Sequence, residues 1–306
     1  MEATVIDFET ARAHRGDYMV RGTAADGMVR AFAVTARNTV QTARENHDTS
    51  PVVTAALGRL MMGALMTGMM FKEPDELVTF IVRGDGPIGS LTVTANCNGQ
   101  VKGFPANSQV WIPLKSNGKL DVGGAVGHGT LSAVRDIPGE EPYSSLLELV
   151  SGEIGDDLTH YFMASDQIPT SVGVGVLVGR DTNVECAGGF IIQLMPGCTD
   201  EVAAHIEQTL AGVTSVTDLL SAGATPTNVL ETVLDGLGYQ ELETHPVEFF
   251  CGCNEERAAR TVLALGEDKL REIIATGEPA EVHCHFCGKR HYLSTETLQS
   301  LLETAE

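Results

Sequence analysis

The chain has 306 residues, of which 43% are hydrophobic, and it carries a formal net charge of -21. This composition is typical of a globular protein of two or three domains, and it excludes an intrinsically disordered chain. The negative charge disfavours general binding to nucleic-acid phosphates, and it helps to keep in solution a protein that exposes apolar surface.

The start of the chain gives no sign of export. The segment from Met1 to Asp17 contains four acidic residues and no apolar run, so we expect no signal peptide. The seven cysteines are an odd number, which is typical of free thiols in a reducing compartment, so we expect a cytoplasmic protein. Cys97, Cys186 and Cys198 are scattered, and we expect them to be buried, inert thiols.

The segment from Tyr18 to Thr35 predicts a β-hairpin. Apolar residues alternate on both sides of Asp26-Gly27, a dipeptide typical of a tight turn between antiparallel strands. A polar helix is expected to follow, from Thr35 to Asn46.

A second, much more apolar helix is predicted to begin at Ser50-Pro51. Serine suits the N-cap of a helix and proline suits its first position. The run from Val52 to Phe71 is rich in methionine and long enough to resemble a membrane span. Arg59 and three glycines interrupt it, so we expect a buried central helix and no membrane partner. The alternative interpretation is that the methionines of this run form a surface that adapts to varied apolar partners.

Two strands are expected at Leu77–Val82 and Leu91–Ala95. Between them, residues 84–89 match the dinucleotide-binding pattern G-x-G-x-x-G. That motif needs a helix after the loop, whereas here a strand follows, so we interpret the glycines as a hairpin turn. Further short strands are predicted near Val110 and Leu131.

The second half of the N-terminal region mixes helix and strand. Apolar residues three or four apart predict a helix from Pro142 to Ala164. The acidic side chains along this stretch are interpreted as solvated charge. Buried strands are expected at Val172–Val178 and Gly189–Leu194, and the first domain is predicted to end near Pro196.

Residues 197–246 change in character. Three short helices are predicted, at Thr199–Leu210, Val216–Leu220 and Val229–Leu234, with glycines between them. Short helices are marginal alone and depend on packing for their order. This segment is therefore either a metastable helical linker or an ordinary helical hairpin packed on the first domain.

Four cysteines near the C-terminus are spaced like the ligands of one metal ion. They form the pairs Cys251-Gly252-Cys253 and Cys284-His285-Phe286-Cys287, separated by a helical segment that Asn254 can cap and that Gly266 can end. Tetrahedral thiolate sites select zinc or iron–sulfur, and zinc is the expected ion. Three nearby histidines are possible substitute metal ligands, namely His283, His285 and His291. We expect them only to flank the site, because four sulfurs already fill the coordination shell.

Several stretches together resemble one family. PVEFFCGCNEERAARTVLALG, EVHCHFCGKRHYL, RGTAADGMVRAFAV, EPYSSLLELVSGEI and AGGFIIQLMPG are similar to segments of the Hsp33 family of redox-regulated holdase chaperones. The resemblance extends over nearly the whole chain. It implies an α+β protein with a large mixed N-terminal domain (1–196), a helical linker (197–246) and a C-terminal zinc-binding redox module (247–306).

The resemblance also implies a mechanism and partners. Neighbouring sulfurs pair most easily on oxidation, which gives the disulfides Cys251–Cys253 and Cys284–Cys287 and leaves the two loops unconnected. The expected consequences are release of the single zinc ion, unfolding of the module, ATP-independent capture of unfolded client proteins and formation of a homodimer. No nucleic-acid partner is expected.

Two other functions compete with this one. A constitutive zinc-ribbon module that binds protein would keep its metal through mild oxidation. A metalloenzyme would need an open coordination position, which four cysteines do not leave, and the sequence shows no nucleophile–base motif. We therefore expect no enzymatic activity.

Overall fold

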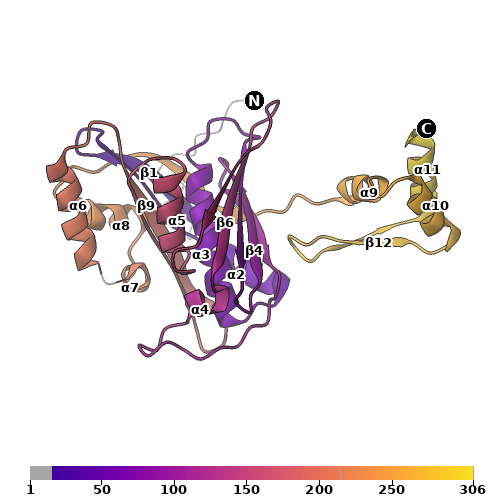
Figure 1. Ribbon diagram of the computed structural model, residues 1–306, viewed down its shortest axis with the longest axis horizontal. Coiled ribbons are helices and arrows are strands. Elements are labelled where there is room, and N and C mark those ends of the chain that lie inside the picture. The colour runs from indigo at the N-terminus through magenta and orange to yellow at the C-terminus, as the bar shows by residue number, and fades with distance from the viewer. Residues whose placement is uncertain (1–15, 214, 306) are drawn as a thin grey trace. The chain divides into compact units, whose positions relative to one another are not determined.

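The computed structural model describes residues 16–213 and 215–305, which form two compact units, Met1–Phe250 and Cys251–Glu306 (Figure 1). Residues 1–15, where no signal peptide is expected, lie outside the described residues. The predicted three-part division of the chain stays a prediction, and the two units are treated separately below.

One sheet of the N-terminal unit has five strands, all antiparallel, in the order β10-β1-β2-β9-β8. The predicted hairpin is confirmed as β1 (Tyr18–Ala24) and β2 (Val29–Thr35), with the turn at Asp26-Gly27. β8 (Thr170–Val178) and β9 (Val184–Leu194) confirm the two later strands, whereas β10 (Gln240–Pro246) was not expected.

The other sheet has six strands in the order β11-β5-β4-β3-β6-β7. Its members are β3 (Leu77–Gly84), β4 (Ser90–Asn96), β5 (Gln100–Pro105), β6 (Gly129–Asp136), β7 (Tyr143–Glu148) and β11 (Glu248–Phe249). The glycine motif closes the β3–β4 hairpin, where Gly84 N–H donates to Gly89 O over 2.8 Å, so the turn interpretation is confirmed.

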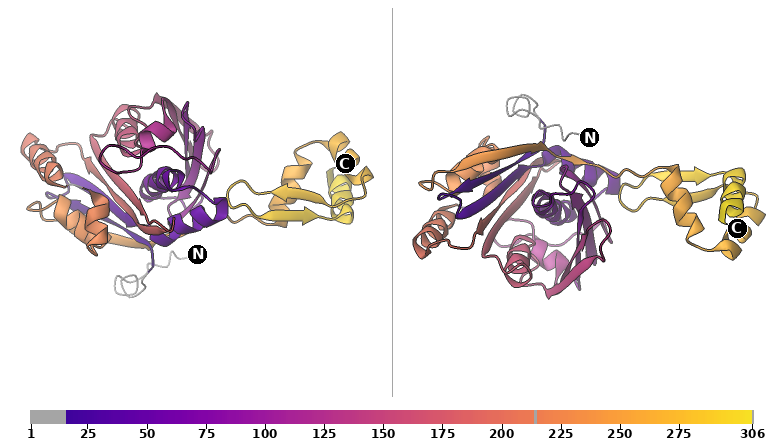
Figure 2. Two further views of the ribbon diagram at one scale, coloured as in Figure 1. Left: turned by 90° about the horizontal axis from the view of Figure 1, so that it is seen from below. Right: turned by 90° about the horizontal axis from the view of Figure 1, so that it is seen from above.

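The apolar helix α3 (Pro51–Gly68) lies between the two sheets, as both views of Figure 2 show. Every residue of α3 except Pro51 and Arg59 is buried, and the cluster around it draws side chains from both sheets. By length and hydropathy α3 is the one helix among the described residues that is able to cross a membrane, and 89% of it is buried inside the protein. The prediction of a buried central helix is confirmed.

Arg59 is the charged residue that this core helix has to accommodate. Its Nη1 donates to Glu153 Oε2 over 2.8 Å, and Lys115 forms a second ion pair with the same carboxylate. Burial raises the pKa of Glu153, but hydrogen bonds from Lys115 and Arg59 outweigh it, and the pKa is lowered from its ordinary value.

The predicted helix from Pro142 to Ala164 is wrong in its first half. β7 replaces it as an edge strand beside β6, and the helix α5 begins only at Gly155 and ends at Ala164. The chain turns at Gly152 and Ile154, whose φ angles are both positive, 72° and 61°. The buried Asp157 carboxylate accepts N–H groups of this turn, including those of Val150 and Ile154. A capped turn therefore interrupts the helical pattern.

The N-terminal unit contains two further helices, α2 (Arg37–His47) and α4 (Val122–Val126). α2 confirms the predicted polar helix, and the five-residue α4 precedes β6. The strand predicted near Val110 is wrong, because that residue lies in an irregular segment where its backbone exchanges hydrogen bonds with the Ser50 hydroxyl at the start of α3.

Three helices cover the outer face of the five-stranded sheet: α6 (Asp200–Gly212), α7 (Val216–Ser221) and α8 (Pro226–Val233). Their buried residues pack on the strand residues that point away from α3 and form a second cluster. α6 contributes one fully buried residue, Ile206, whereas α8 contributes several. The helices of the 197–246 segment thus depend on this sheet face for their burial.

The C-terminal unit contains α9 (Glu255–Leu263), α10 (Glu267–Ala275), a two-stranded sheet of β12 (Ala280–His283) and β13 (Arg290–Leu293), and α11 (Thr295–Ala305). The predicted cap of α9 is confirmed, since Asn254 Oδ1 accepts Arg257 N–H over 2.9 Å, and Ser294 Oγ caps α11 in the same way by accepting Thr297 N–H over 3.2 Å. The buried apolar core of the C-terminal unit is small and consists of Ala258, Ala259, Val262, Leu270, Leu293 and Leu298.

Candidate metal centre

Two short loops bring the four cysteines together. The first loop, Cys251-Gly252-Cys253, leads into α9, and Gly252 takes a positive φ of 61° there. The second loop joins β12 to β13, and its turn is closed by two backbone hydrogen bonds, Cys284 N–H to Lys289 O at 2.9 Å and Gly288 N–H to Cys284 O at 2.8 Å. Gly288 also has a positive φ, 69°, which a residue with a side chain adopts only with strain.

The four sulfurs form one cluster. All of them lie within 4.8 Å of one another, so they can hold a metal ion. The closest approaches join the two loops: Cys251 Sγ to Cys284 Sγ and Cys253 Sγ to Cys287 Sγ, each 3.4 Å. A disulfide bond is about 2.05 Å long, so these are free thiols in contact. The sequence prediction that these four residues converge is therefore matched by the geometry.

Of the three histidines considered from the sequence as substitute ligands, His291 contacts a cysteine of the cluster. It is buried on β13, and its Nε2 lies 3.3 Å from Cys253 Sγ. His283 and His285 instead contact each other edge to face, with ring centroids 5.8 Å apart and an interplanar angle of 73°. The alternation of buried His291 and Leu293 with exposed Arg290 and Tyr292 was the available signal, because it places His291 on the inner face of the strand.

Without an ion, the thiols influence one another's ionisation. Burial, followed by the hydrogen bond with Cys287, raises the pKa of Cys253 to about 11. Burial also raises the pKa of Cys251, by more. Burial acts in the same direction on Cys284, but the hydrogen bond from Cys251 and backbone N–H groups lower its pKa overall. A bound cation favours the thiolate form at all four positions, so metal affinity and pH are linked.

The remaining three cysteines are not part of this centre. They are partly exposed, and the expectation that they are buried is wrong. Cys97 lies in the β4–β5 turn and Cys198 in the turn before α6, where the backbone is too near the surface to cover a side chain. Cys186, on β9, points toward α7, with its Sγ 3.7 Å from Thr217 O.

The chain is similar to known proteins over most of its length. The family model described as Hsp33 protein matches residues 17–294. The 33 kDa chaperonin of Agathobacter rectalis is 46% identical over 285 residues, which are 93% of this chain and 99% of that protein. The 33 kDa chaperonin of Bacillus pumilus is 44% identical, over 94% of this chain and 98% of the relative.

The fold agrees with these sequence matches. The crystal structure of the 33 kDa chaperonin from Thermotoga maritima superimposes with a TM-score of 0.87 at 35% identity, and the match covers 95% of this chain and 99% of that one. The resemblance noted from the sequence and the expected α+β class are thereby confirmed. On the strength of a family match over nearly its whole length, the chain belongs to the Hsp33 family, whose members are chaperones and not enzymes.

Proposed function

We propose that this chain is a redox-regulated, ATP-independent holdase that binds one zinc ion when it is reduced. The observation that carries the proposal is the convergence of four thiols, from loops on either side of α9 and α10, within 4.8 Å of one another. Four sulfurs around zinc at about 2.3 Å lie about 3.8 Å apart, which agrees with this cluster. The ligands are Cys251, Cys253, Cys284 and Cys287.

The zinc ion has a structural role in this proposal. Four larger side chains, Val262, Leu270, Leu293 and Leu298, form most of the core of the C-terminal unit. Burying them contributes roughly 6–12 kcal/mol in total, at about 1.5–3 kcal/mol each. A structural zinc site contributes roughly 10–16 kcal/mol, which is a comparable or larger amount. The unit therefore depends on its metal for folding.

Oxidation removes the metal ligands. Two thiolates, one peroxide and two protons give one disulfide and two waters, and the zinc ion leaves because disulfide sulfurs no longer carry negative charge. We propose the pairs Cys251–Cys253 and Cys284–Cys287, which leave the loops unconnected. The 3.4 Å contacts run between the loops, so pairing across them competes with this outcome and would keep the loops joined.

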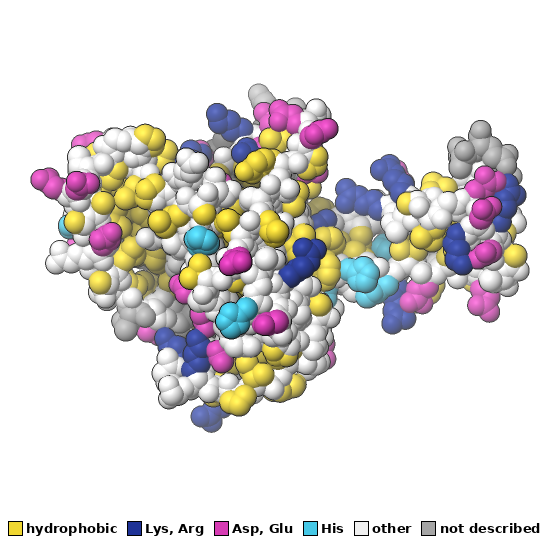
Figure 3. All heavy atoms as spheres, viewed as in Figure 1, with side chains coloured by type: hydrophobic (Ala, Val, Ile, Leu, Met, Phe, Trp, Pro, Cys, Tyr) yellow, Lys and Arg dark blue, Asp and Glu magenta, His cyan; other side chains and the backbone are white. Residues whose placement is uncertain are grey.

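Unfolding of the C-terminal unit then loosens the preceding segment. Only Phe250 separates Cys251 from β11, a two-residue strand, and Phe250 N–H donates to Val101 O over 2.9 Å. Before β11 comes β10, an edge strand, and before β10 come α6, α7 and α8. If these helices separate from the sheet, they uncover an apolar face that includes Val20, Phe190 and Ile192. Figure 3 shows that apolar side chains already reach the visible surface around α6.

The decisive experiment compares the chain in two redox states. A chemically unfolded client is diluted into buffer with either reduced or peroxide-treated protein, while a chelating dye reports zinc release. We expect suppression of aggregation only after oxidation and in step with zinc release. The variant Cys284→Ser removes one of the four proposed zinc ligands. Cys186→Ser is its matched control, because Cys186 lies on β9 outside the cluster.

The outcomes separate the competing functions. Equal suppression by both redox states refutes the switch, and suppression by neither refutes a holdase activity. Zinc retained through mild oxidation favours the constitutive zinc-ribbon module. We further propose that the protein acts in the cytoplasm, without nucleic-acid or membrane partners, and that its oxidised form is a homodimer, which sedimentation of the two redox states tests.

A further inference from the structure

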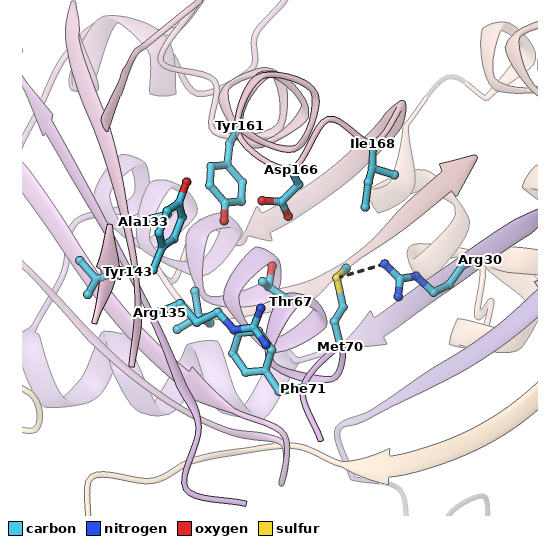
Figure 4. Close-up of a pocket in the computed structure, with 12 residues that line it drawn as sticks. Arg30, Thr67, Met70, Phe71, Ala133, Arg135, Tyr143, Tyr161, Asp166 and Ile168 are labelled. Carbon is cyan, nitrogen blue, oxygen red and sulfur yellow. Dashed lines mark hydrogen bonds between the residues drawn. The ribbon is translucent and has the colours of Figure 1, made fainter. Parts of the chain in front are cut away.

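A cavity in the N-terminal unit lies at the C-terminal end of α3, far along the chain from the cysteines, and is called here the α3-end pocket. Its volume is about 390 Å³. Figure 4 shows that it is surrounded by side chains from β2, the end of α3, β6, β7, α5 and the segment after α5. Nothing in the proposed redox mechanism uses this pocket.

Arg30 is an unusual residue at its position. On β2 the side chains of Arg30, Phe32 and Val34 share one face, and the other two belong to the core around α3. The strand alternation thus puts a guanidinium where the pattern calls for an apolar side chain. Polar residues at core-facing positions often mark functional sites.

The partners of Arg30 are neutral. Its Nε and Nη2 donate to Gln193 Oε1 over 3.1 and 2.5 Å, and Nη2 lies 3.9 Å from Met70 Sδ. Over residues 16–213 and 215–305, no carboxylate forms an ion pair with this guanidinium. Burial and then the nearby charge of Arg21 lower the pKa of Arg30, and the longer-range attraction of Asp166 offsets only part of this.

The second guanidinium of the pocket is already paired. Arg135 lies over the Phe71 ring, 4.6 Å from its centroid, and forms an ion pair with the buried Glu76. The Arg135 side chain therefore lines the pocket, but its charge is already compensated by Glu76. Of the two cations that line the pocket, Arg30 is therefore the one available to an anionic group.

One carboxylate also lines the pocket, apart from Arg30. The Asp166 side chain follows α5 and accepts a hydrogen bond from the Tyr161 hydroxyl, while Arg30 and Arg135 act on it only through longer-range attraction. Burial raises the pKa of Asp166, because these contacts compensate only part of the lost hydration. In Figure 4 Asp166 and Arg30 both point toward the hollow. A separated cationic and anionic group thus share one cavity.

Most of the other lining residues are apolar, although Thr67, Tyr143 and Tyr161 add hydroxyl groups. Met70, Phe71, Val78, Ala133 and Ile168 form much of the wall. Small-molecule sites combine such apolar walls with a few fixed polar groups, and they have volumes of about 300–1,000 Å³.

From this arrangement we propose that the α3-end pocket binds a small zwitterion with an apolar side chain, of the class of free hydrophobic α-amino acids. The ligand's carboxylate pairs with the Arg30 guanidinium, its ammonium group with the Asp166 carboxylate, and its side chain packs against Met70 and Phe71. This proposal is independent of the redox switch.

Calorimetric titration of the reduced, zinc-loaded protein tests the proposal without any mutation. The probes are L-leucine and L-phenylalanine, each compared with the amine that lacks the carboxylate and the acid that lacks the ammonium group. Loss of one charge-assisted contact weakens binding by at least about tenfold, so we expect both analogues to bind that much more weakly. If neither amino acid binds, or if an analogue binds as tightly, the proposal is wrong.

Two variants assign the contacts. Arg30→Gln is expected to weaken amino-acid binding by at least about tenfold, whereas Arg83→Gln, at an exposed position on β3 outside the pocket, leaves it unchanged. Asp166→Asn is expected to weaken binding of the amino acid but not of the deaminated acid. Circular dichroism verifies that each variant is folded. Folded Arg30→Gln that binds as tightly as the wild type overturns the assignment.

Discussion

Removal of the metal under reducing conditions tests the structural role of zinc apart from any oxidation. A zinc chelator is added to the reduced protein, and hydrogen exchange is followed by mass spectrometry across the chain. The metal contributes roughly 10–16 kcal/mol, against roughly 6–12 kcal/mol from the four larger core residues of the C-terminal unit. Whole domains are stable by only about 5–15 kcal/mol. Losing the metal term therefore leaves this unit unfolded.

The expected pattern is confined to one part of the chain. Amide groups in α9, α10, β12, β13 and α11 exchange as in an unfolded peptide after chelation, whereas those of α3 and the central strands β2 and β9 keep their protection. Cys253→Ser reproduces the effect without chelator, and Cys186→Ser does not. Protection of residues 255–302 that survives loss of the metal would show that the small core suffices, and the reasoning behind the switch would fail.

Three other predictions concern single side chains. His291→Ala removes the buried contact to Cys253 and is expected to weaken zinc affinity about 10–100-fold in a dye competition assay, whereas His283→Ala, at an exposed position, is not. Leu60→Ala empties space beside the core helix and is expected to lower the free energy of unfolding in urea by about 2–5 kcal/mol, while Leu114→Ala, at an exposed position, changes it little. Glu153→Gln costs about 1–3 kcal/mol at neutral pH. Because the pKa of Glu153 is lowered on folding, the stabilisation from its carboxylate is present above the ordinary value of 4.5 and is lost as pH falls through the folded pKa. Thermal unfolding of both proteins at a series of pH values should therefore show the stability deficit of Glu153→Gln disappear in that acidic range. A deficit that stays constant with pH contradicts the assignment.

Sequence patterns predicted the elements that are defined by local rules. The Asp26-Gly27 hairpin, the Ser50-Pro51 helix start and the Asn254 cap each depend on a few neighbouring residues, and each is present. The four cysteines converge as predicted for a similar reason, because two closely spaced cysteine pairs are a local pattern typical of metal sites.

The errors arose where distant contacts decide the structure. Leu146, Leu149 and Val150 have helical spacing, yet pairing with β6 draws the first part of this stretch into a sheet edge. β10 was missed because the sequence QELETHP is polar, as suits an edge strand, and only pairing with β1 reveals it. The α3-end pocket was missed for the same reason: Arg30 and Asp166 are distant in sequence, and only the two sheets and α5 bring them to one cavity.

In the proposed mechanism, loss of the metal reaches the N-terminal unit through the short segment between β10 and Cys251. β10 ends at Pro246, and between it and Cys251 the chain is held by hydrogen bonds such as Val247 N–H to Asp17 O and Phe250 N–H to Val101 O. Each contributes about 0.5–1.5 kcal/mol net, so the junction is weaker than a metal centre worth roughly 10–16 kcal/mol. In the proposed mechanism, unfolding of the C-terminal unit leaves this segment held by these hydrogen bonds alone, so fraying enters the five-stranded sheet at β10, its edge, and reaches the helices on its outer face before the core around α3.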